Sequence, residues 1–297
     1  MITLPQLWSD CLHDPQKTIR IGAFDNSVSR WHASHVQKAL KKKHRSHSFE
    51  CVFHADLKAA AKAGAIDFAV WDFAHPSAKT SHGFAVGAML KRQNPGDALL
   101  SRDGYTLETL PTGATVATNN LRSRGQLLFT RKDLKIKSVE LSTSEKCDAV
   151  VAPYEEIRRL GREDAISELL GYDFMLPEPG EGGVVVQCLR GCAPCAFTEP
   201  LHDEKTHLAV LAESSYLHGL GTNKDAPVAA FAAISRKTMT LAGAVIACDG
   251  SEKHLLQTTI DLPQEPMEAR KTVSALGKKL AKIALEDGAQ QLMEVRS

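Results

Sequence analysis

The sequence predicts an α/β fold that ends in a small α+β region with an antiparallel sheet. Short apolar strands alternate with helices up to about Leu201, which is typical of parallel sheets covered by helices. Beyond that point, β-rich runs surround the turn Asp249-Gly250, a pattern typical of antiparallel hairpins. A long amphipathic helix then closes the chain. These three observations predict helix-covered parallel sheets followed by a separate antiparallel one.

The composition is that of a folded globular protein. The chain has 297 residues, of which 43% are hydrophobic and 24% are charged, so it is not a disordered chain. Its formal net charge of +1 gives no overall basic field, and we expect no nucleic-acid partner. No apolar run approaches the roughly 18 residues of a membrane helix, and the first residues do not resemble a secretory signal. We therefore expect a cytoplasmic monomer without a membrane partner.

The first elements follow from their local patterns. Ile19–Ala23 is a short strand, and Asn26 or Ser27 caps a helix that runs to about Leu40. The basic run Lys41–Arg45 suits the negative end of the helix dipole, and we prefer this interpretation to a nucleic-acid patch. The elements that follow are a strand Cys51–His54, a helix Asp56–Ala63 and strands Ile66–Trp71 and Phe84–Leu90.

A second region begins near Leu99. It contains a strand Thr115–Thr118, a helix Asn119–Phe129, a strand Ile136–Leu141, a helix Tyr154–Leu160 and a strand Val184–Cys188. The last region contains a helix Thr206–Leu217, strands Val228–Ser235, Thr240–Cys248 and Leu255–Asp261, and a helix Glu268–Asp287 with Gly288 at its C-cap.

The seven cysteines are an odd number in a chain long enough to form a large core, so we expect reduced thiols. Cys188, Cys192 and Cys195 have a C-x3-C-x2-C spacing that three iron ligands of a cluster can share. Cys188 also ends an apolar strand, where a buried thiol behaves as a small hydrophobe. We prefer this second interpretation and predict no metal, although the spacing alone does not decide between the two.

The most chemical local feature is the transition from strand to helix at Thr118-Asn119-Asn120-Leu121-Arg122. A helix that starts at the carboxyl end of a parallel strand directs N–H groups and the positive end of its dipole at one place. Thr118, Asn119 and Asn120 add polar side chains, and Arg122 adds charge. We predict that these four residues bind a small carboxylate or phosphate in a cleft between two lobes. Plain helix capping beside a surface arginine is the alternative.

Several segments in unbroken order resemble the hydroxymethylbilane synthase (porphobilinogen deaminase) family, from about Ile19 to nearly the end. They are I-R-I-G at Ile19–Gly22, A-I-D-F-A-V at Ala65–Val70, G-F-A-V-G-A-M-L-K-R-Q-N-P-G-D-A-L at Gly83–Leu99, L-P-T-G-A-T-V-A-T-N-N-L-R at Leu110–Arg122, D-A-V-V-A at Asp148–Ala152, R-R-L-G at Arg158–Gly161, P-G-E-G-G-V-V-V-Q-C at Pro179–Cys188 and L-A-G-A-V…D-G at Leu241–Gly250.

The resemblance implies two periplasmic-binding-protein-like lobes of type II around a cleft, and a third domain that carries a covalent dipyrromethane. We place lobe 1 at residues 17–97 and 178–200, lobe 2 at 98–177, and the C-terminal α+β domain at 201–297. The family joins porphobilinogen units with release of ammonia, which gives the linear precursor of haem. This is a transferase reaction of tetrapyrrole biosynthesis.

The residues that the resemblance assigns to cofactor attachment and catalysis are replaced. The family's cofactor cysteine falls at Lys224, whose amine is mostly protonated near neutral pH because its reference pKa is about 10.4. We therefore expect no cofactor. The family's H-S-x-K-D-x-P motif reads Trp71-Asp72-Phe73-Ala74-His75-Pro76, without its lysine and aspartate in place.

The arginines that hold the substrate's carboxylates in the family are also reduced in number. The motif T-R-x-S reads Ala23-Phe24-Asp25-Asn26, and S-S-L-R-R reads Asn119-Asn120-Leu121-Arg122-Ser123, which keeps one arginine. The R-G-N-x-x-T-R-L segment is absent, and A-E-R has become Ala212-Glu213-Ser214.

Three hypotheses follow from these departures. The chain is a family member that has lost polymerising activity, a pseudoenzyme; or it is a clamshell-shaped binding module for a small carboxylate or phosphate; or it is an atypical but active deaminase. The absent cysteine and aspartate favour the first two.

Overall fold

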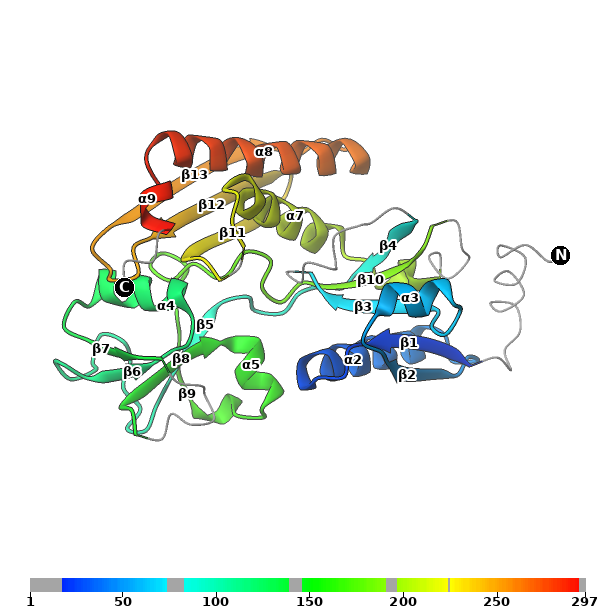
Figure 1. The fold of residues 1–297 in the computed structure, drawn as a ribbon, viewed down its shortest axis with the longest axis horizontal. Coiled ribbons are helices and arrows are strands. Elements are labelled where there is room, and N and C mark those ends of the chain that lie inside the picture. Colours follow the sequence, from blue (N-terminus) through cyan, green and yellow to red (C-terminus); the bar gives the residue numbers. More distant parts are fainter. Residues whose placement is uncertain (1–17, 74–82, 139–145, 191–196, 224, 294–297) are drawn as a thin grey trace. The chain divides into compact units, whose positions relative to one another are not determined.

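The computed structural model describes residues 18–73, 83–138, 146–190, 197–223 and 225–293 (Figure 1). Contacts between residues divide the chain into two compact units. Unit 1 comprises Met1–Arg92 and Gly182–His207, and unit 2 comprises Gln93–Glu181 and Leu208–Ser297. The chain therefore crosses from one unit to the other three times.

Unit 1 is built on a five-stranded sheet in the order β2-β1-β3-β10-β4. Strands β1, β2 and β3 are parallel, whereas β10 is antiparallel to both of its neighbours, β3 and β4. The bounds are β1 Ile19–Ala23, β2 Phe49–Phe53, β3 Phe68–Asp72, β4 Phe84–Met89 and β10 Val184–Leu189.

Two helices cover the two faces of this sheet (Figure 1). Helix α2 (Ser27–Lys43) is capped by the Asn26 side chain, and its buried residues pack on the face that includes Ile21. Helix α3 (Leu57–Lys62) is capped by Asp56, whose carboxylate accepts hydrogen bonds from the N–H groups at the start of the helix.

Unit 2 contains a second five-stranded sheet in the order β7-β6-β8-β5-β9. Here β6, β7 and β8 are parallel, and β5 is antiparallel to both β8 and β9. The bounds are β5 Asp97–Ser101, β6 Thr115–Ala117, β7 Lys135–Lys137, β8 Ala149–Pro153 and β9 Ile166–Leu169. The two sheets therefore have the same strand topology. In each sheet the fourth strand in the order, β10 or β5, comes from a part of the chain distant from its neighbours in the sheet.

Helices α4 (Leu121–Thr130) and α5 (Tyr154–Arg159) lie on opposite faces of this second sheet. Leu127 of α4 packs with Leu99, Val116 and Val151, whereas Ile157 of α5 packs with residues of the other parity, such as Ala98. Short 3-10 turns, η3 (Glu163–Ala165) and η4 (Glu199–Leu201), stand before β9 and α7.

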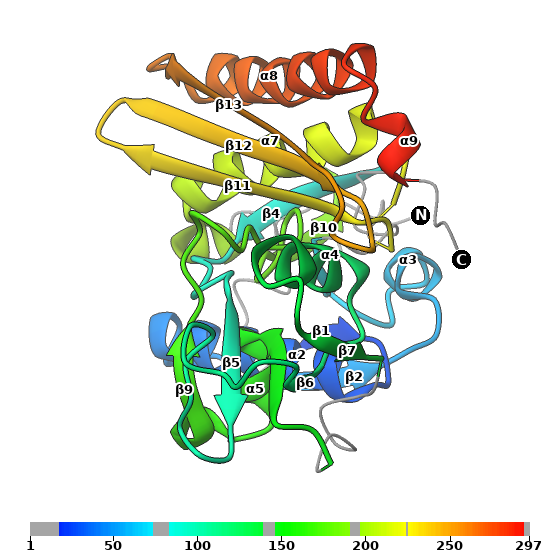
Figure 2. The ribbon, with the colours of Figure 1, turned by 90° about the vertical axis from the view of Figure 1, so that its left-hand side faces the viewer.

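The rest of unit 2 is an antiparallel sheet in the order β11-β12-β13 with helices on one face (Figure 2). Its elements are β11 Val228–Ser235, β12 Thr238–Ile246, β13 Lys253–Asp261, α7 Glu204–Gly219, α8 Pro266–Glu286 and α9 Gln290–Met293, and the first residues of α7, up to His207, belong to unit 1. Buried residues of α7 and α8 pack on the sheet, and Tyr216 lies against Gly243. Helix α4 lies beside the turn that joins β12 and β13, where the Arg124 guanidinium donates to the Cys248 carbonyl at 3.2 Å (Figure 2).

The predicted fold class is confirmed: type II α/β sheets are followed by a small antiparallel sheet. The three domain ranges stay predictions. Of the described helices, none is long and apolar enough to cross a membrane. Cys188 is buried in β10, but its sulfur is disulfide-bonded, so the expectation of a reduced thiol is wrong there. Cys192 and Cys195 lie outside the described residues.

Candidate functional site

The predicted site lies at the N-terminus of α4, directly after β6. Asn120 is the N-cap, and its side-chain oxygen accepts hydrogen bonds from the N–H groups of Arg122 and Ser123 at 2.9 and 3.3 Å. Thr118 is buried and donates its N–H to the Lys137 carbonyl, whereas Asn119 is exposed. The strand therefore passes into the helix at a point where short polar side chains lie near solvent.

Backbone donors at this terminus are available to a ligand. The N–H groups of Asn119 and Leu121 make no hydrogen bond with the described residues. The first N–H groups of a helix have no partner within it, and the helix dipole makes this end favourable for negative charge. The arrangement suits one carboxylate or phosphate oxygen near Asn119 and Leu121.

Arg122 is directed into unit 2, not toward solvent. Its side chain is 1% exposed and forms a bidentate ion pair with Asp97, at 2.6 and 3.1 Å. It also donates to the Leu176 carbonyl at 2.7 Å. Burial alone would lower the pKa of Arg122, but the neighbouring Asp97 carboxylate raises it overall, so the guanidinium stays charged. These contacts give Arg122 a structural role, and direct ligand binding by this residue stays a prediction.

Helix α4 and its N-cap also form hydrogen bonds with residues 176–178, in the segment that leads out of unit 2. Gln126 both donates to the Leu176 carbonyl and accepts from its N–H, at 2.9 and 3.0 Å, and Asn120 donates to Glu178 at 3.2 Å. Glu213 of α7 is fully buried and accepts from the N–H groups of Gly180 and Ala232. Sequence reasoning missed Gln126 and Asp97 as partners, although Asp97 lies in a segment quoted for the resemblance.

The other predicted positions are placed as follows. Lys224 lies outside the described residues. Phe24 and Asp72 lie in unit 1, one residue after β1 and at the end of β3. They are part of a different compact unit from Thr118–Arg122.

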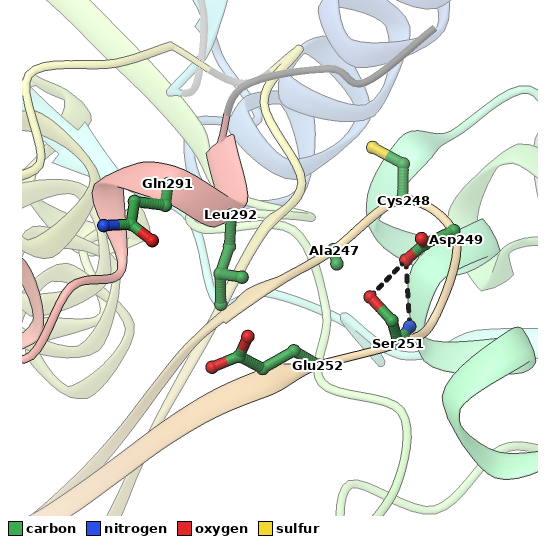
Figure 3. Close-up of a pocket in the computed structure, with 7 residues that line it drawn as sticks. All are labelled: Ala247, Cys248, Asp249, Ser251, Glu252, Gln291 and Leu292. Carbon is green, nitrogen blue, oxygen red and sulfur yellow. Dashed lines mark hydrogen bonds between the residues drawn. The ribbon is translucent and has the colours of Figure 1, made fainter.

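A small cavity of about 90 Å³ lies between the β12–β13 turn and α9 (Figure 3). Its lining is Ala247, Cys248, Asp249, Ser251, Glu252, Gln291 and Leu292. The N–H and the hydroxyl of Ser251 both donate hydrogen bonds to the Asp249 carboxylate, at 2.9 and 2.6 Å. Sites for drug-sized ligands measure roughly 300–1,000 Å³, so this cavity is too small for a pyrrole dimer.

His202, Glu204 and His207 have ligand atoms within 4.8 Å of one another, a group with metal-ligand chemistry. The Met89 N–H donates to His202 Nδ1 at 3.0 Å, while His202 Nε2 lies 2.7 Å from the Glu204 carboxylate. Because Nδ1 uses its lone pair as an acceptor, Nε2 carries the proton that Glu204 accepts. A metal-bound imidazole donates a hydrogen bond through one ring nitrogen and gives the lone pair of the other to the metal, whereas here the lone pair of His202 Nδ1 already accepts from Met89. This group therefore ties the end of β4 to the start of α7.

Residues 47–194 match the family model described as "Porphobilinogen deaminase, dipyromethane cofactor binding domain". A porphobilinogen deaminase of Thermobifida fusca is 32% identical over 253 residues, which cover 82% of this chain and 79% of that protein. This chain belongs to the porphobilinogen deaminase family. A porphobilinogen deaminase of Syntrophotalea carbinolica is 29% identical, with 93% of this chain and 95% of that protein covered. Among solved structures, a periplasmic substrate-binding protein of an ABC transporter from Coxiella burnetii is 15% identical, covering 66% of this chain and 95% of that one, with a TM-score of 0.38.

The family model corrects one expectation. The sequence led us to expect no cofactor, because Lys224 stands at the attachment position. That prediction is wrong: the matched model is that of a dipyrromethane cofactor binding domain, which points to a dipyrromethane. The α4 N-terminus fits part of this group, since the N–H groups of Asn119 and Leu121 suit one of its carboxylates.

Proposed function

We propose that this member of the porphobilinogen deaminase family binds a small carboxylate-bearing ligand at the α4 N-terminus and does not polymerise porphobilinogen. A dipyrromethane, when bound, supplies the pyrrole end to which further pyrroles are joined. Thr118, Asn119 and Asn120 would hold one of its carboxylates. Arg122 would hold the first turn of α4 in position through its contacts with Asp97 and the Leu176 carbonyl.

The burial of Arg122 carries this proposal. The guanidinium is 1% exposed and is already paired with Asp97 and the Leu176 carbonyl, so although its Nε makes no hydrogen bond with the described residues, burial keeps it from a substrate carboxylate in solvent. Of the other arginines in the family's motifs, one is replaced by Phe24, one by Ser123 and one by Ser214. What is left at α4 is a set of neutral donors at a helix end, which suits a single carboxylate held weakly.

The enzymatic half is tested by incubating the purified full chain with porphobilinogen. We expect no hydroxymethylbilane, measured as uroporphyrin after acid treatment and oxidation. Uroporphyrin above the level of a protein-free control would show that the chain is an atypical active deaminase.

The binding half is tested by NMR titration with sodium propionate and, separately, with phosphate. We expect saturating shifts of the Asn119–Arg122 amides. Asn120→Ala, which removes the cap, should weaken the binding several-fold. Asn26→Ala is the matched control, because it removes the equivalent cap of α2 in unit 1. Equal effects of the two variants, or no shift at α4, would contradict the site.

A further inference from the structure

Strands β11 and β13 form the two edges of the three-stranded sheet of unit 2 (Figure 2). At the β11 edge, the Ala230 N–H donates to the Pro177 carbonyl at 3.1 Å. The Ala232 N–H on the same edge donates to the Glu213 carboxylate at 2.8 Å. On the other side of the sheet, no described strand lies beside β13. We call this outer side of Lys253–Asp261 the β13 edge.

The register shows which backbone groups of β13 point outward. Successive residues of an antiparallel strand direct their N–H and C=O groups to opposite sides. Because Ala230 and Ala232 point away from β12, Phe231 points toward it and pairs with Ala242. Ala242 lies opposite Gln257 on its other side, so Gln257 points away from β12. The pairing has no bulge, and every second residue of β13 points outward in the same way: Lys253, Leu255, Gln257, Thr259 and Asp261.

These outward groups are open to a partner. The N–H groups of Leu255, Gln257 and Thr259 make no hydrogen bond with the described residues. Their side chains are exposed as well, Leu255 to 49%. Strand edges are commonly protected by a proline, a bulge or a charge in mid-strand, and β13 has none of these over its nine residues. Such a row of backbone groups is a template for a further strand.

The pattern of side chains along β13 is complementary to itself. In an antiparallel pair centred on Gln257, Lys253 lies opposite the partner subunit's Asp261, and Leu255 lies opposite the partner subunit's Thr259. All of these residues point outward, so every pair can exchange backbone hydrogen bonds. Opposite charges directly across two strands stabilise the pairing. Any other centre leaves part of β13 without a partner and separates the two charges.

Both charges are available for this pairing. Asp261 is exposed and makes no ion pair with the described residues. Lys253 donates from Nζ to the Phe174 carbonyl at 3.3 Å, and its ammonium has further N–H donors for a carboxylate. The two side chains lie on the face turned away from α7 and α8, because Leu256 and Ile260, of the other parity, pack with those helices.

We infer that the β13 edge binds a second copy of this chain, with the two β13 strands antiparallel about Gln257 in one six-stranded sheet. A strand that pairs with its own copy forms an isologous contact, which closes as a dimer. The β11 edge is already bonded, so each copy has one strand edge to offer in this sheet. The inference does not depend on the proposed site at α4, whose residues lie outside β13.

The test is sedimentation velocity of the purified full chain from micromolar to millimolar concentration, together with amide hydrogen exchange measured by NMR. We expect the fraction of dimer to rise with concentration. The amides of Leu255, Gln257 and Thr259 should exchange at least ten-fold more slowly in the dimer. Those of Leu256 and Thr258, which already face β12, should change little. A monomer at every concentration would agree with the expectation from the sequence and would overturn the inference.

One substitution at the edge has a matched control on the same face of the sheet. Gln257→Lys places two like charges at the centre of the pairing and should weaken the dimer at least ten-fold. Ala233→Lys adds the same charge at an exposed position of β11 and should leave the dimer unchanged. Equal effects of the two variants, or a dimer in which the Leu255 and Thr259 amides stay unprotected, would place the contact elsewhere and contradict the inference.

Exchange of charges tests the register. Asp261→Lys and Lys253→Glu should each weaken the dimer, and an equimolar mixture of the two variants should restore it, because both mixed pairs join opposite charges. A mixture that associates no more tightly than its components would overturn the pairing about Gln257. If Lys253→Glu is poorly folded because it loses the Phe174 contact, Gln257→Lys and its control still decide the question.

Discussion

At the residue scale, the buried Asp97–Arg122 pair changes the interpretation of the Thr118–Arg122 motif. The sequence predicts that Arg122 binds a ligand, whereas the structure pairs it with Asp97 inside unit 2. Both side chains are 1% exposed. Asp97→Ala leaves the arginine buried and uncompensated, and removing one partner of such a pair typically costs about 3–5 kcal/mol. The double variant with Arg122→Met should recover most of that loss in urea unfolding. Asp25→Ala, which breaks the exposed pair with Arg30, should change the midpoint little; equal losses in the two single variants would contradict the argument.

His44 makes stability depend on pH. Burial lowers the pKa of this imidazole below 6.5, and its ring stacks on Phe197 with centroids 3.7 Å apart. A lowered pKa means that folding favours the neutral ring. Its contribution is complete above pH 6.5 and is lost as the pH falls through the lower folded-state value. In urea unfolding from pH 7.5 downward, His44→Gln should show a shallower loss of stability below pH 6.5 than the unsubstituted chain; parallel curves would exclude this role.

At the element scale, most helices and strands could be predicted because periodicity and caps are local properties. β1 and β11 agree residue for residue with the expected strands, and the cap of α2 is Asn26, one of the two predicted candidates. Asp56, expected as the first residue of its helix, is the N-cap of α3. Strands β5, β8 and β9 were not predicted from the sequence. β8 is bounded by no Gly or Asn signal, and β9 is short and carries polar residues at an edge of its sheet.

The turn between β12 and β13 is where two elements of unit 2 meet closely. Gly250 has φ +69, and a Cβ there would lie 2.5 Å from Leu128 of α4. Gly104 has φ +71 with nothing within 4 Å, so it is a matched control for the backbone alone. We expect Gly104→Ala to cost about 1–2 kcal/mol, from the left-handed conformation only. Gly250→Ala should cost clearly more in chemical unfolding, because α4 must also move; equal costs would show that the contact is loose.

At the scale of the whole molecule, the fold could be predicted much further than the site. The family's segments occur in the same order along this chain. Because each segment forms one helix or strand of the family's fold, that order indicated the topology. The partner of Arg122 is a long-range property: Asp97 lies 25 residues away in sequence, and no local pattern pairs the two. The prediction of no cofactor was wrong because it relied on one position, Lys224, whereas the family model that overturned it matches a whole cofactor-binding domain.

The residues that distinguish this chain from the family's motifs are distributed over both units, and this leads to the last prediction. Restoring the family's cysteine with Lys224→Cys returns one thiol, but Phe24 still replaces an arginine in unit 1 and Arg122 stays paired with Asp97 in unit 2. Catalysis depends on several contacts that together position the reacting groups, so we expect a single repair to restore no turnover. We expect Lys224→Cys and the unsubstituted chain to form equally little uroporphyrin from porphobilinogen, with the Thermobifida fusca porphobilinogen deaminase as the positive control under the same conditions. Turnover by Lys224→Cys alone would show that the missing arginines are dispensable and that one side chain separates this chain from an active enzyme.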